Sequence, residues 1–366
     1  MLARLSQRVE KLWLLTDSIS DTLSDELAQY PRLELVVFDW ARFAQDSFTW
    51  LTEREGEVDI VHDTMGCFAS YFQSHGPSRH RSARLVSTLY TNNWGWFHRV
   101  RRRRMDFGIS YVGQRVLTLW KDRRVCRNAD RVFVLGPGHE HDIIAAHGVP
   151  VSRVTWIPSE VNTERFYPPE TPAVTRPTIL FTGAICRNKG IDTLLDACSL
   201  LAERGEEFSL RLVGRVLYWE EQWLADACKS AGLGERLTLT GAILYESLLW
   251  EYQDAGVFAF PSRFEGSPRS LREAVACGTS AVVTDIPGHR GIDPHGEFMR
   301  FVQGNDPELW ADALSSALRE SSDRYQRRAE DGAAHMRSVH SLESVAGRLA
   351  ELYTEVLAEP AWSVAE

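Results

Sequence analysis

Short apolar runs alternate with longer helical patterns along the chain, and this alternation constrains the fold more than any other feature. It is typical of strands that feed crossover helices in a parallel sheet. In the first half, the predicted strands are Lys11–Leu15, Leu33–Phe38, Asp59–His62, Arg84–Leu89, Arg131–Leu135 and Val154–Ile157. In the second half, they are Thr178–Phe181, Ser209–Val213, Leu237–Thr240, Val257–Phe260 and Ser280–Val283. Predicted helices include Ile191–Arg204, Leu271–Ala276 and the amphipathic Ser341–Leu357.

A proline-rich break from Tyr167 to Pro177 separates the two halves, because prolines at this density stop both helices and central strands. We therefore expect domains at 1–168 and 169–340, and a C-terminal helix at 341–366 that packs back towards the first domain. Both domains are predicted to be Rossmann-like and doubly wound. Their strand C-termini would face a central cleft, where open α/β sheets bind ligands.

Composition excludes several classes of function. The formal net charge is −9, which disfavours general nucleic-acid binding. The six cysteines form no CxxC pair, so neither a zinc site nor a disulfide framework is expected. No apolar run approaches the roughly 20 residues that span a bilayer. A cytoplasmic location is expected, and the basic run Arg99–Arg104 is either a peripheral membrane contact, a site for a phosphorylated acceptor, or a solvated helix face.

The densest chemical motif runs from Phe258 to Ala274 and reads as strand, turn and helix. Pro268 stands where the first helical turn would begin, and free N–H groups at a helix start form an anion site. Glu265 lies in the loop and Glu273 about two turns into the helix, so two carboxylates can flank one ligand. In isolation, such a pair would be interpreted as a helix cap at Glu265 and a solvated helix residue at Glu273; the surrounding motifs are what favour a ligand site.

Several segments together resemble the retaining glycosyltransferases of family 4, which have a GT-B fold. The spacing of Glu265 and Glu273 resembles the family's Glu-x7-Glu signature. The segments similar to other family motifs are Ala129–Leu135, Val154–Phe166, Thr182–Gly190 and Leu239–Ile243. The resemblance covers most of residues 125–320, and it implies a nucleotide diphosphate sugar as the donor.

The resemblance also implies roles for single residues. Glu265 would contact hydroxyls of the donor sugar, Glu273 would bind the ribose diol, and Lys189 would bind the diphosphate. Arg187 is a further candidate catalytic residue, together with Glu265 and Lys189. The remaining donor-binding candidates are Gly266, Ser267, Pro268, Arg269, Ser270, Gly183, Ala184, Gly214, Ala242 and Ile243. In this chain Ala184 stands where the family usually has an arginine. Arg187, Arg263 and Arg269 are the candidates to replace that charge.

The acceptor side departs further from the family pattern, because its N-terminal glycine-rich loop is absent and Tyr90 replaces a frequent histidine. Aromatic faces stack on sugar rings and asparagines bind hydroxyls, although the same aromatics also suit a core. The acceptor-binding candidates are His62, Tyr90, Asn92, Asn93 and Trp94. His62 ends a predicted strand and could face the cleft, although a lone histidine is more often structural.

The sequence therefore predicts a retaining, metal-independent glycosyltransferase without a cofactor. It would move a sugar, most favourably from a UDP-sugar, to a hydroxyl of a sugar, glycolipid or small molecule. The alternatives are a catalytically silent nucleotide-sugar-binding partner protein and a GT-B-fold isomerase or phosphorylase. The sequence does not identify the donor base, the donor sugar, the acceptor, the regiochemistry or the oligomeric state.

Overall fold

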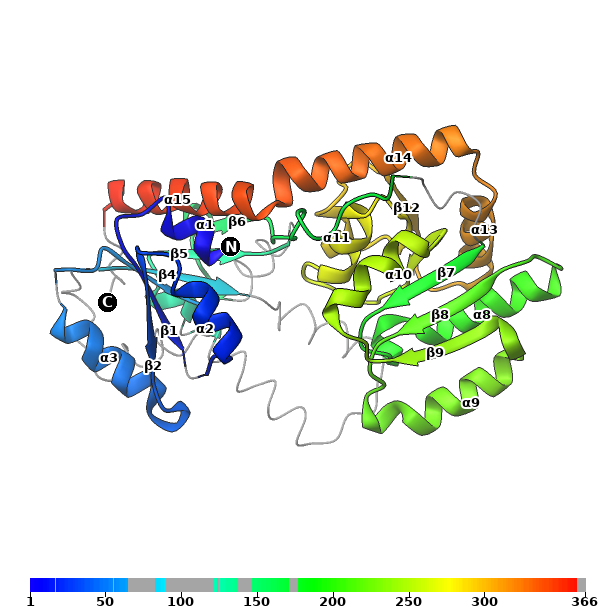
Figure 1. Ribbon diagram of the computed structural model, residues 1–366, viewed down its shortest axis with the longest axis horizontal. Coiled ribbons are helices and arrows are strands. Elements are labelled where there is room, and N and C mark those ends of the chain that lie inside the picture. The colour runs from blue at the N-terminus through cyan, green and yellow to red at the C-terminus, as the bar shows by residue number, and fades with distance from the viewer. Residues whose placement is uncertain are drawn as a thin grey trace. The chain divides into compact units, whose positions relative to one another are not determined.

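The protein was analysed as a computed structural model, which describes residues 1–16, 18–54, 56–64, 83–89, 122–123, 125–136, 147–170 and 177–360. The chain divides into two compact units (Figure 1). The N-terminal unit comprises Met1–Pro158 and Leu342–Glu366, and the C-terminal unit comprises Ser159–Ser341.

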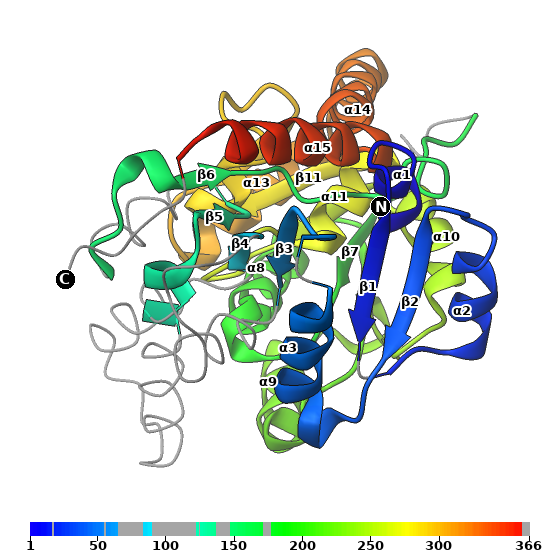
Figure 2. The same cartoon turned by 90° about the vertical axis from the view of Figure 1, so that its left-hand side faces the viewer.

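Parallel strands form the centre of the N-terminal unit. One sheet pairs β1 (Leu12–Thr16) with β2 (Leu33–Val37), which run side by side in Figure 2. A second sheet has the order β3 (Ile60–Asp63), β4 (Arg84–Leu89), β5 (Arg131–Val134) and β6 (Val154–Trp156). The helices before β3 are α1 (Leu2–Ser6), α2 (Asp21–Leu27) and α3 (Phe43–Glu53). All six strands overlap the predicted ones, since each carries the apolar run from which it was predicted.

The C-terminal helix α15 (Leu342–Ala358) belongs to the N-terminal unit. Its apolar face contributes Leu349 and Leu352 to a buried cluster with Val86 of β4 and Phe133 of β5. At the same helix, Tyr353 contacts the side chain of His62. The predicted return of this helix to the first domain is confirmed.

A six-stranded parallel sheet forms the C-terminal unit. Its strands, in spatial order, are β12 (Met299–Val302), β11 (Ser280–Thr284), β10 (Val257–Phe260), β7 (Thr178–Thr182), β8 (Ser209–Val213) and β9 (Leu237–Gly241). The helices are α8 (Ile191–Glu203), α9 (Glu221–Ala231), α10 (Leu248–Asp254), α11 (Arg269–Ala276), α12 (Pro287–Arg290), α13 (Pro307–Leu318) and α14 (Ser322–His335). The chain winds outward from β7 in one direction and from β10 in the other, so the strand order reverses between these two strands.

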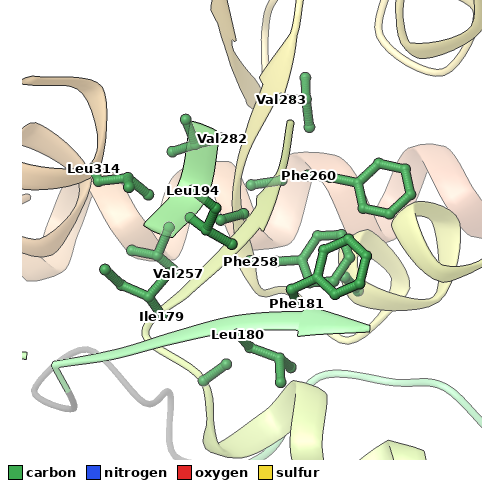
Figure 3. Close-up of a cluster of buried hydrophobic side chains, with 14 of the residues drawn as sticks. Ile179, Leu180, Phe181, Leu194, Val257, Phe258, Phe260, Val282, Val283 and Leu314 are labelled. Atoms are coloured by element: carbon green, nitrogen blue, oxygen red, sulfur yellow. The ribbon is translucent and has the colours of Figure 1, made fainter. Parts of the chain in front are cut away.

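The core of the C-terminal unit is built on β7 and β10. Every residue of β10 is buried, which explains why its uninterrupted apolar run predicted the strand so well. Phe181 of β7 stacks on Phe260 at 5.6 Å between ring centroids, while Leu194 of α8 and Leu314 of α13 fill the flanks (Figure 3).

Two features differ from the sequence prediction. β12 was not predicted, because it is an edge strand with Arg300 in its centre. The Arg300 guanidinium pairs with the buried carboxylate of Glu320 at 2.7 Å. The first unit boundary falls after Pro158 rather than at residue 168. The physical reason is that the side chains of Val161 and Phe166 are buried in the core of the C-terminal unit.

Candidate functional site

The loops that follow β7 and β10 meet where the strand order reverses, which is the position at which doubly wound sheets bind ligands. The backbone N–H of Arg263 donates to the carbonyl of Asn188 at 3.0 Å. Gly190 has a φ of +72°, and a Cβ at this position would lie 2.0 Å from the carbonyl oxygen of Pro261. A glycine is therefore required for the two loops to approach this closely.

Lys189 and Glu265 form an ion pair between these loops. The Lys189 ammonium donates to Glu265 Oε1, and the Ser262 hydroxyl donates to the same oxygen at 2.6 Å. Their side chains are only 24% and 11% exposed, so the pair is partly shielded from water. The ammonium also lies 5.6 Å from the centroid of the Phe260 ring. Two residues 76 positions apart are thus brought together as a donor site would require.

Glu273 lies on α11, and its carboxylate is buried between two tyrosines. Tyr252 donates to Oε2 at 2.9 Å, and Tyr245 donates to Oε1 at 3.0 Å. Burial raises the pKa of Glu273, while the two phenolic hydrogen bonds act to lower it. Burial and the neighbouring carboxylate raise the pKa of Tyr245 to about 12, so its phenol stays protonated and donates.

Helix α11 begins at Arg269, and Pro268 is its N-cap residue without a side-chain cap. The first N–H groups of this helix are therefore not satisfied by a capping side chain, as an anion site requires. Arg272 is buried beneath this turn, where it donates to the hydroxyl of Ser267 and, at 3.3 Å, to the carbonyl of Glu160. Ser267 is thus oriented from below by a buried guanidinium.

The glycines predicted for the donor site lie on three adjacent loops. Gly183 follows β7, and its N–H donates to the carbonyl of Val213 at 2.9 Å. Gly214 follows β8, where an added Cβ would lie 1.8 Å from the Gly183 carbonyl oxygen. The Gly214 N–H donates to the carbonyl of Gly241 at 2.8 Å, directly before Ala242 and Ile243. These predicted positions therefore share the carboxyl edge of one sheet.

The three arginines considered as replacements at Ala184 differ in their partners. Arg187 lies 3.5 Å from the Glu220 carboxylate, with its guanidinium over the Trp223 ring. Arg263 pairs with Asp192 at 2.6 Å and also donates to the carbonyl of Arg187. Arg269 is exposed and makes no ion pair or hydrogen bond through its side chain to the residues that the structure describes.

Sequence reasoning missed Gly288 and His289, which support the Glu265 loop from α12. A Cβ on Gly288 would lie 2.3 Å from the Glu265 carbonyl oxygen. His289 is fully buried against Phe260; its Nδ1 donates to the Thr284 carbonyl at 2.8 Å, and burial lowers its pKa to about 4. No signal in the sequence marked these residues, since neither belongs to a recognisable motif.

Of the predicted acceptor residues, His62 is the one that the structure describes. Its Nδ1 lies 2.6 Å from the Tyr353 hydroxyl and its Nε2 lies 2.6 Å from Thr88 Oγ1. Burial lowers the pKa of His62 to about 4. Both ring nitrogens are thus engaged within the N-terminal unit, which favours the structural interpretation. Tyr90, Asn92, Asn93, Trp94 and the run Arg99–Arg104 lie outside the described residues.

Two other features are absent from the described residues. No group of three or more His, Cys, Asp or Glu side chains is arranged to hold a metal ion among them. No helix within the described ranges combines the length and apolar character needed for a bilayer crossing.

Residues 176–320 match the family model described as "Glycosyl transferases group 1". This segment contains β7 through α13, and hence Lys189, Glu265 and Glu273.

Curated relatives are similar over part of the chain. The chain is 28% identical over 272 residues to D-inositol 3-phosphate glycosyltransferase of Corynebacterium urealyticum, covering 67% of this chain and 62% of the relative. It is 28% identical over 243 residues to mannosylfructose-phosphate synthase of Agrobacterium fabrum, covering 62% and 53%. The chain thus spans less than two thirds of the length of these relatives.

Solved structures show the same architecture. Sucrose-phosphate synthase of Thermosynechococcus elongatus superposes with a TM-score of 0.69 at 20% identity, covering 90% of this chain and 84% of that one. HepE of Anabaena, solved with UDP and glucose, has a TM-score of 0.72 at 12% identity, covering 96% and 94%. The protein has the GT-B fold, as predicted.

Proposed function

We propose that this protein is a retaining, metal-independent glycosyltransferase that uses a nucleotide diphosphate sugar. The observation that carries the proposal is the meeting of Lys189, Glu265 and the first turn of α11 at the reversal of a doubly wound sheet. The matching family model and the names of the curated relatives support the reaction class.

The ribose, the diphosphate and the sugar of the donor would each be bound by a different set of groups in the C-terminal unit. The Glu273 carboxylate accepts hydrogen bonds from a ribose diol, since each oxygen has lone pairs beyond those used by Tyr245 and Tyr252. The ammonium of Lys189 and the N–H groups of α11 bind the diphosphate. Glu265 meets hydroxyls of the transferred sugar. UDP is the favoured nucleotide, because HepE was solved with UDP and with UDP-glucose.

The proposed transfer needs no protein nucleophile. The bond between the anomeric carbon and the phosphate oxygen breaks, and a bond to the acceptor oxygen forms on the same face of the sugar. The proton of the acceptor hydroxyl passes to the departing phosphate oxygen. Lys189 and the α11 amides stabilise the negative charge that develops on the leaving diphosphate.

The acceptor is proposed to bind the N-terminal unit as a sugar, glycolipid or small molecule with a free hydroxyl. Tyr90, Asn92, Asn93 and Trp94 remain the candidates for this contact. The names of the curated relatives contain inositol 3-phosphate and mannosylfructose phosphate, so phosphorylated polyols and sugars belong in an acceptor panel.

The test is to incubate the protein with a panel of nucleotide sugars, with and without candidate acceptors, and to measure nucleoside diphosphate release. Release that depends on an acceptor and disappears in Lys189→Ala supports the proposal. Tight donor binding without release over long incubation would instead identify a silent nucleotide-sugar-binding partner, which the absence of an arginine at Ala184 makes the second candidate. Phosphate-dependent cleavage or sugar isomerisation would identify a phosphorylase or isomerase.

A further inference from the structure

Arg272 is a buried cation that the proposed reaction does not use. Its side chain on α11 is 3% exposed. Among the described residues, no carboxylate forms an ion pair with its guanidinium, and the charges of Glu160 and Glu273 act on it only at longer range. Burial lowers the pKa of Arg272 to about 10, so it stays charged at neutral pH. Burying such a charge is costly, and an apolar side chain of similar size would avoid the cost. Packing alone therefore does not account for an arginine at this position.

The Arg272 guanidinium contacts the segment through which the chain enters the C-terminal unit. Its Nε donates to the carbonyl of Glu160 at 3.3 Å. Both neighbours of Glu160 are bonded to His340, near the other boundary of the same unit. His340 Nδ1 donates to the Ser159 carbonyl at 2.8 Å, and the Val161 N–H donates to the His340 carbonyl at 2.8 Å. These three residues are buried, so the carbonyl of Glu160 is a fixed anchor for Arg272.

The same guanidinium also contacts the loop between Glu265 and α11. Its Nη1 donates to Ser267 Oγ. Because this oxygen accepts a hydrogen bond from a cation, the proton of the Ser267 hydroxyl must point to a different acceptor, and no residue within the described ranges accepts it. Ser267 directly precedes Pro268, the N-cap residue of α11, which provides no capping side chain. The unused proton of Ser267 and the uncapped N–H groups of α11 are thus neighbours in the chain.

We propose that Arg272 is a positioning residue of the donor site: it fixes the Ser267 hydroxyl between the Glu160 anchor and the start of α11, so that this hydroxyl donates to a phosphate oxygen of the donor. This inference rests on the proposed function, and it adds a residue that does not itself touch the donor. A guanidinium suits the role, because its rigid fork of N–H groups holds two acceptors at a fixed separation. A hydrogen bond from a cation also polarises the Ser267 hydroxyl and strengthens the bond that this hydroxyl donates.

The test is a double-mutant cycle, in which calorimetry measures the UDP affinity of the wild type, Arg272→Met, Ser267→Ala and the double variant. Each single substitution should weaken UDP binding roughly 10-fold, as for loss of a hydrogen bond to a charged group. Because Arg272 acts through Ser267, Arg272→Met should change the affinity by less than about twofold once Ser267→Ala is present. Arg272→Lys keeps the charge and one donor group, so it should lose only about threefold, and Ser267→Ala should abolish this loss as well.

Arg300→Met is the matched control, because Arg300 is a largely buried arginine of the same unit that also donates to a serine hydroxyl, Ser280 Oγ at 3.2 Å. Both methionine variants should unfold at a lower temperature than the wild type, but only Arg272→Met should bind UDP more weakly.

Unchanged UDP affinity in Arg272→Met, or a loss that persists in full beside Ser267→Ala, would overturn the inference and leave the proposed function standing. If Arg272→Met does not fold, the cycle with Arg272→Lys decides in the same way. Failure of the wild type to bind any of a panel of nucleoside diphosphates would instead overturn the proposed function itself.

Discussion

At the scale of single residues, Lys189 and Glu265 satisfy one another in an ion pair. The ion pair is only partly exposed, and Ser262 also donates to the carboxylate. Under the proposed function, a donor diphosphate would compete with Glu265 for the ammonium. The same carboxylate is then available to sugar hydroxyls, which only the complete donor provides.

Glu265→Gln should separate these two roles. Removing the charge frees Lys189, so affinity for UDP should rise by roughly threefold or more, the size of a partly exposed ion pair. Turnover with a complete donor should fall. Glu220→Gln is the control, because it removes a carboxylate beside Arg187 instead of Lys189. Calorimetry and a nucleotide-release assay measure both effects; weaker UDP binding in Glu265→Gln would contradict the competition.

The two tyrosines on Glu273 should contribute unequally to stability. Tyr252 is buried, donates to Glu273, and therefore accepts from the Thr182 hydroxyl at 2.8 Å. Tyr252→Phe leaves both partners unsatisfied and should cost about 1–3 kcal/mol of unfolding free energy. Tyr245 is 39% exposed, so Tyr245→Phe should cost under about 1 kcal/mol. Urea unfolding measures the loss of unfolding free energy in both variants. Equal losses would contradict the prediction that the buried tyrosine contributes more to stability than the exposed one.

The residues proposed for the donor site could be predicted from the sequence, but their hydrogen-bond partners could not. Glu265, Glu273 and Lys189 were predicted because they stand in motifs with recognisable spacing. Tyr245 and Tyr252 were missed, although their separation of seven residues is two helical turns and places them on one side of the chain. Their contact with Glu273 depends on how α10, which contains Tyr252, and the 3-10 turn before it, which contains Tyr245, pack beside α11. No local sequence pattern contains this packing.

At the scale of elements, the contact between the loops after β7 and β10 depends on Gly190. Its added Cβ would collide with a backbone carbonyl, which cannot rotate away as a side chain can. The strand predictions succeeded where apolar runs are continuous, as in β10, and failed for β12, where Arg300 interrupts the pattern. The sequence thus predicted the strands that carry the site, but not the close approach of their loops.

Gly190→Ala should be far more damaging than Gly205→Ala. Both glycines have similar positive φ values, +72° and +74°, but nothing lies within 4 Å of a Cβ at Gly205. Gly205→Ala therefore reports backbone strain alone, about 1 kcal/mol. Gly190→Ala adds a collision and should cost about 2 kcal/mol more, with weakened UDP binding. Thermal unfolding and UDP calorimetry of Gly190→Ala and Gly205→Ala test this prediction. Equal stabilities of the two variants would contradict the close approach of the loops after β7 and β10.

At the scale of the whole molecule, both units hold histidines that are neutral when folded. Burial lowers the pKa of His62 to about 4 in the N-terminal unit, and of His289 to about 4 and His340 to about 3 in the C-terminal unit. An unfolded histidine has a pKa near 6.5. The stability that these groups contribute is therefore fully present above about pH 6.5 and is lost as pH falls towards 4.

We expect the unfolding free energy to fall steadily between pH 6.5 and pH 4, by up to about 1.4 kcal/mol per pH unit for each such histidine. Denaturant unfolding across this range measures the slope. His340→Asn should flatten it, because asparagine can keep the hydrogen bond to the Ser159 carbonyl without titrating. A profile that is flat from pH 7 to pH 5 in the wild type would show that these histidines are not neutral through burial.

A crystal structure with UDP will show directly whether the donor nucleotide binds where the strand order of the C-terminal sheet reverses. We expect the diphosphate between Lys189 and the first turn of α11, and the ribose diol on the carboxylate of Glu273. A nucleotide bound without contact to any of these three would contradict it.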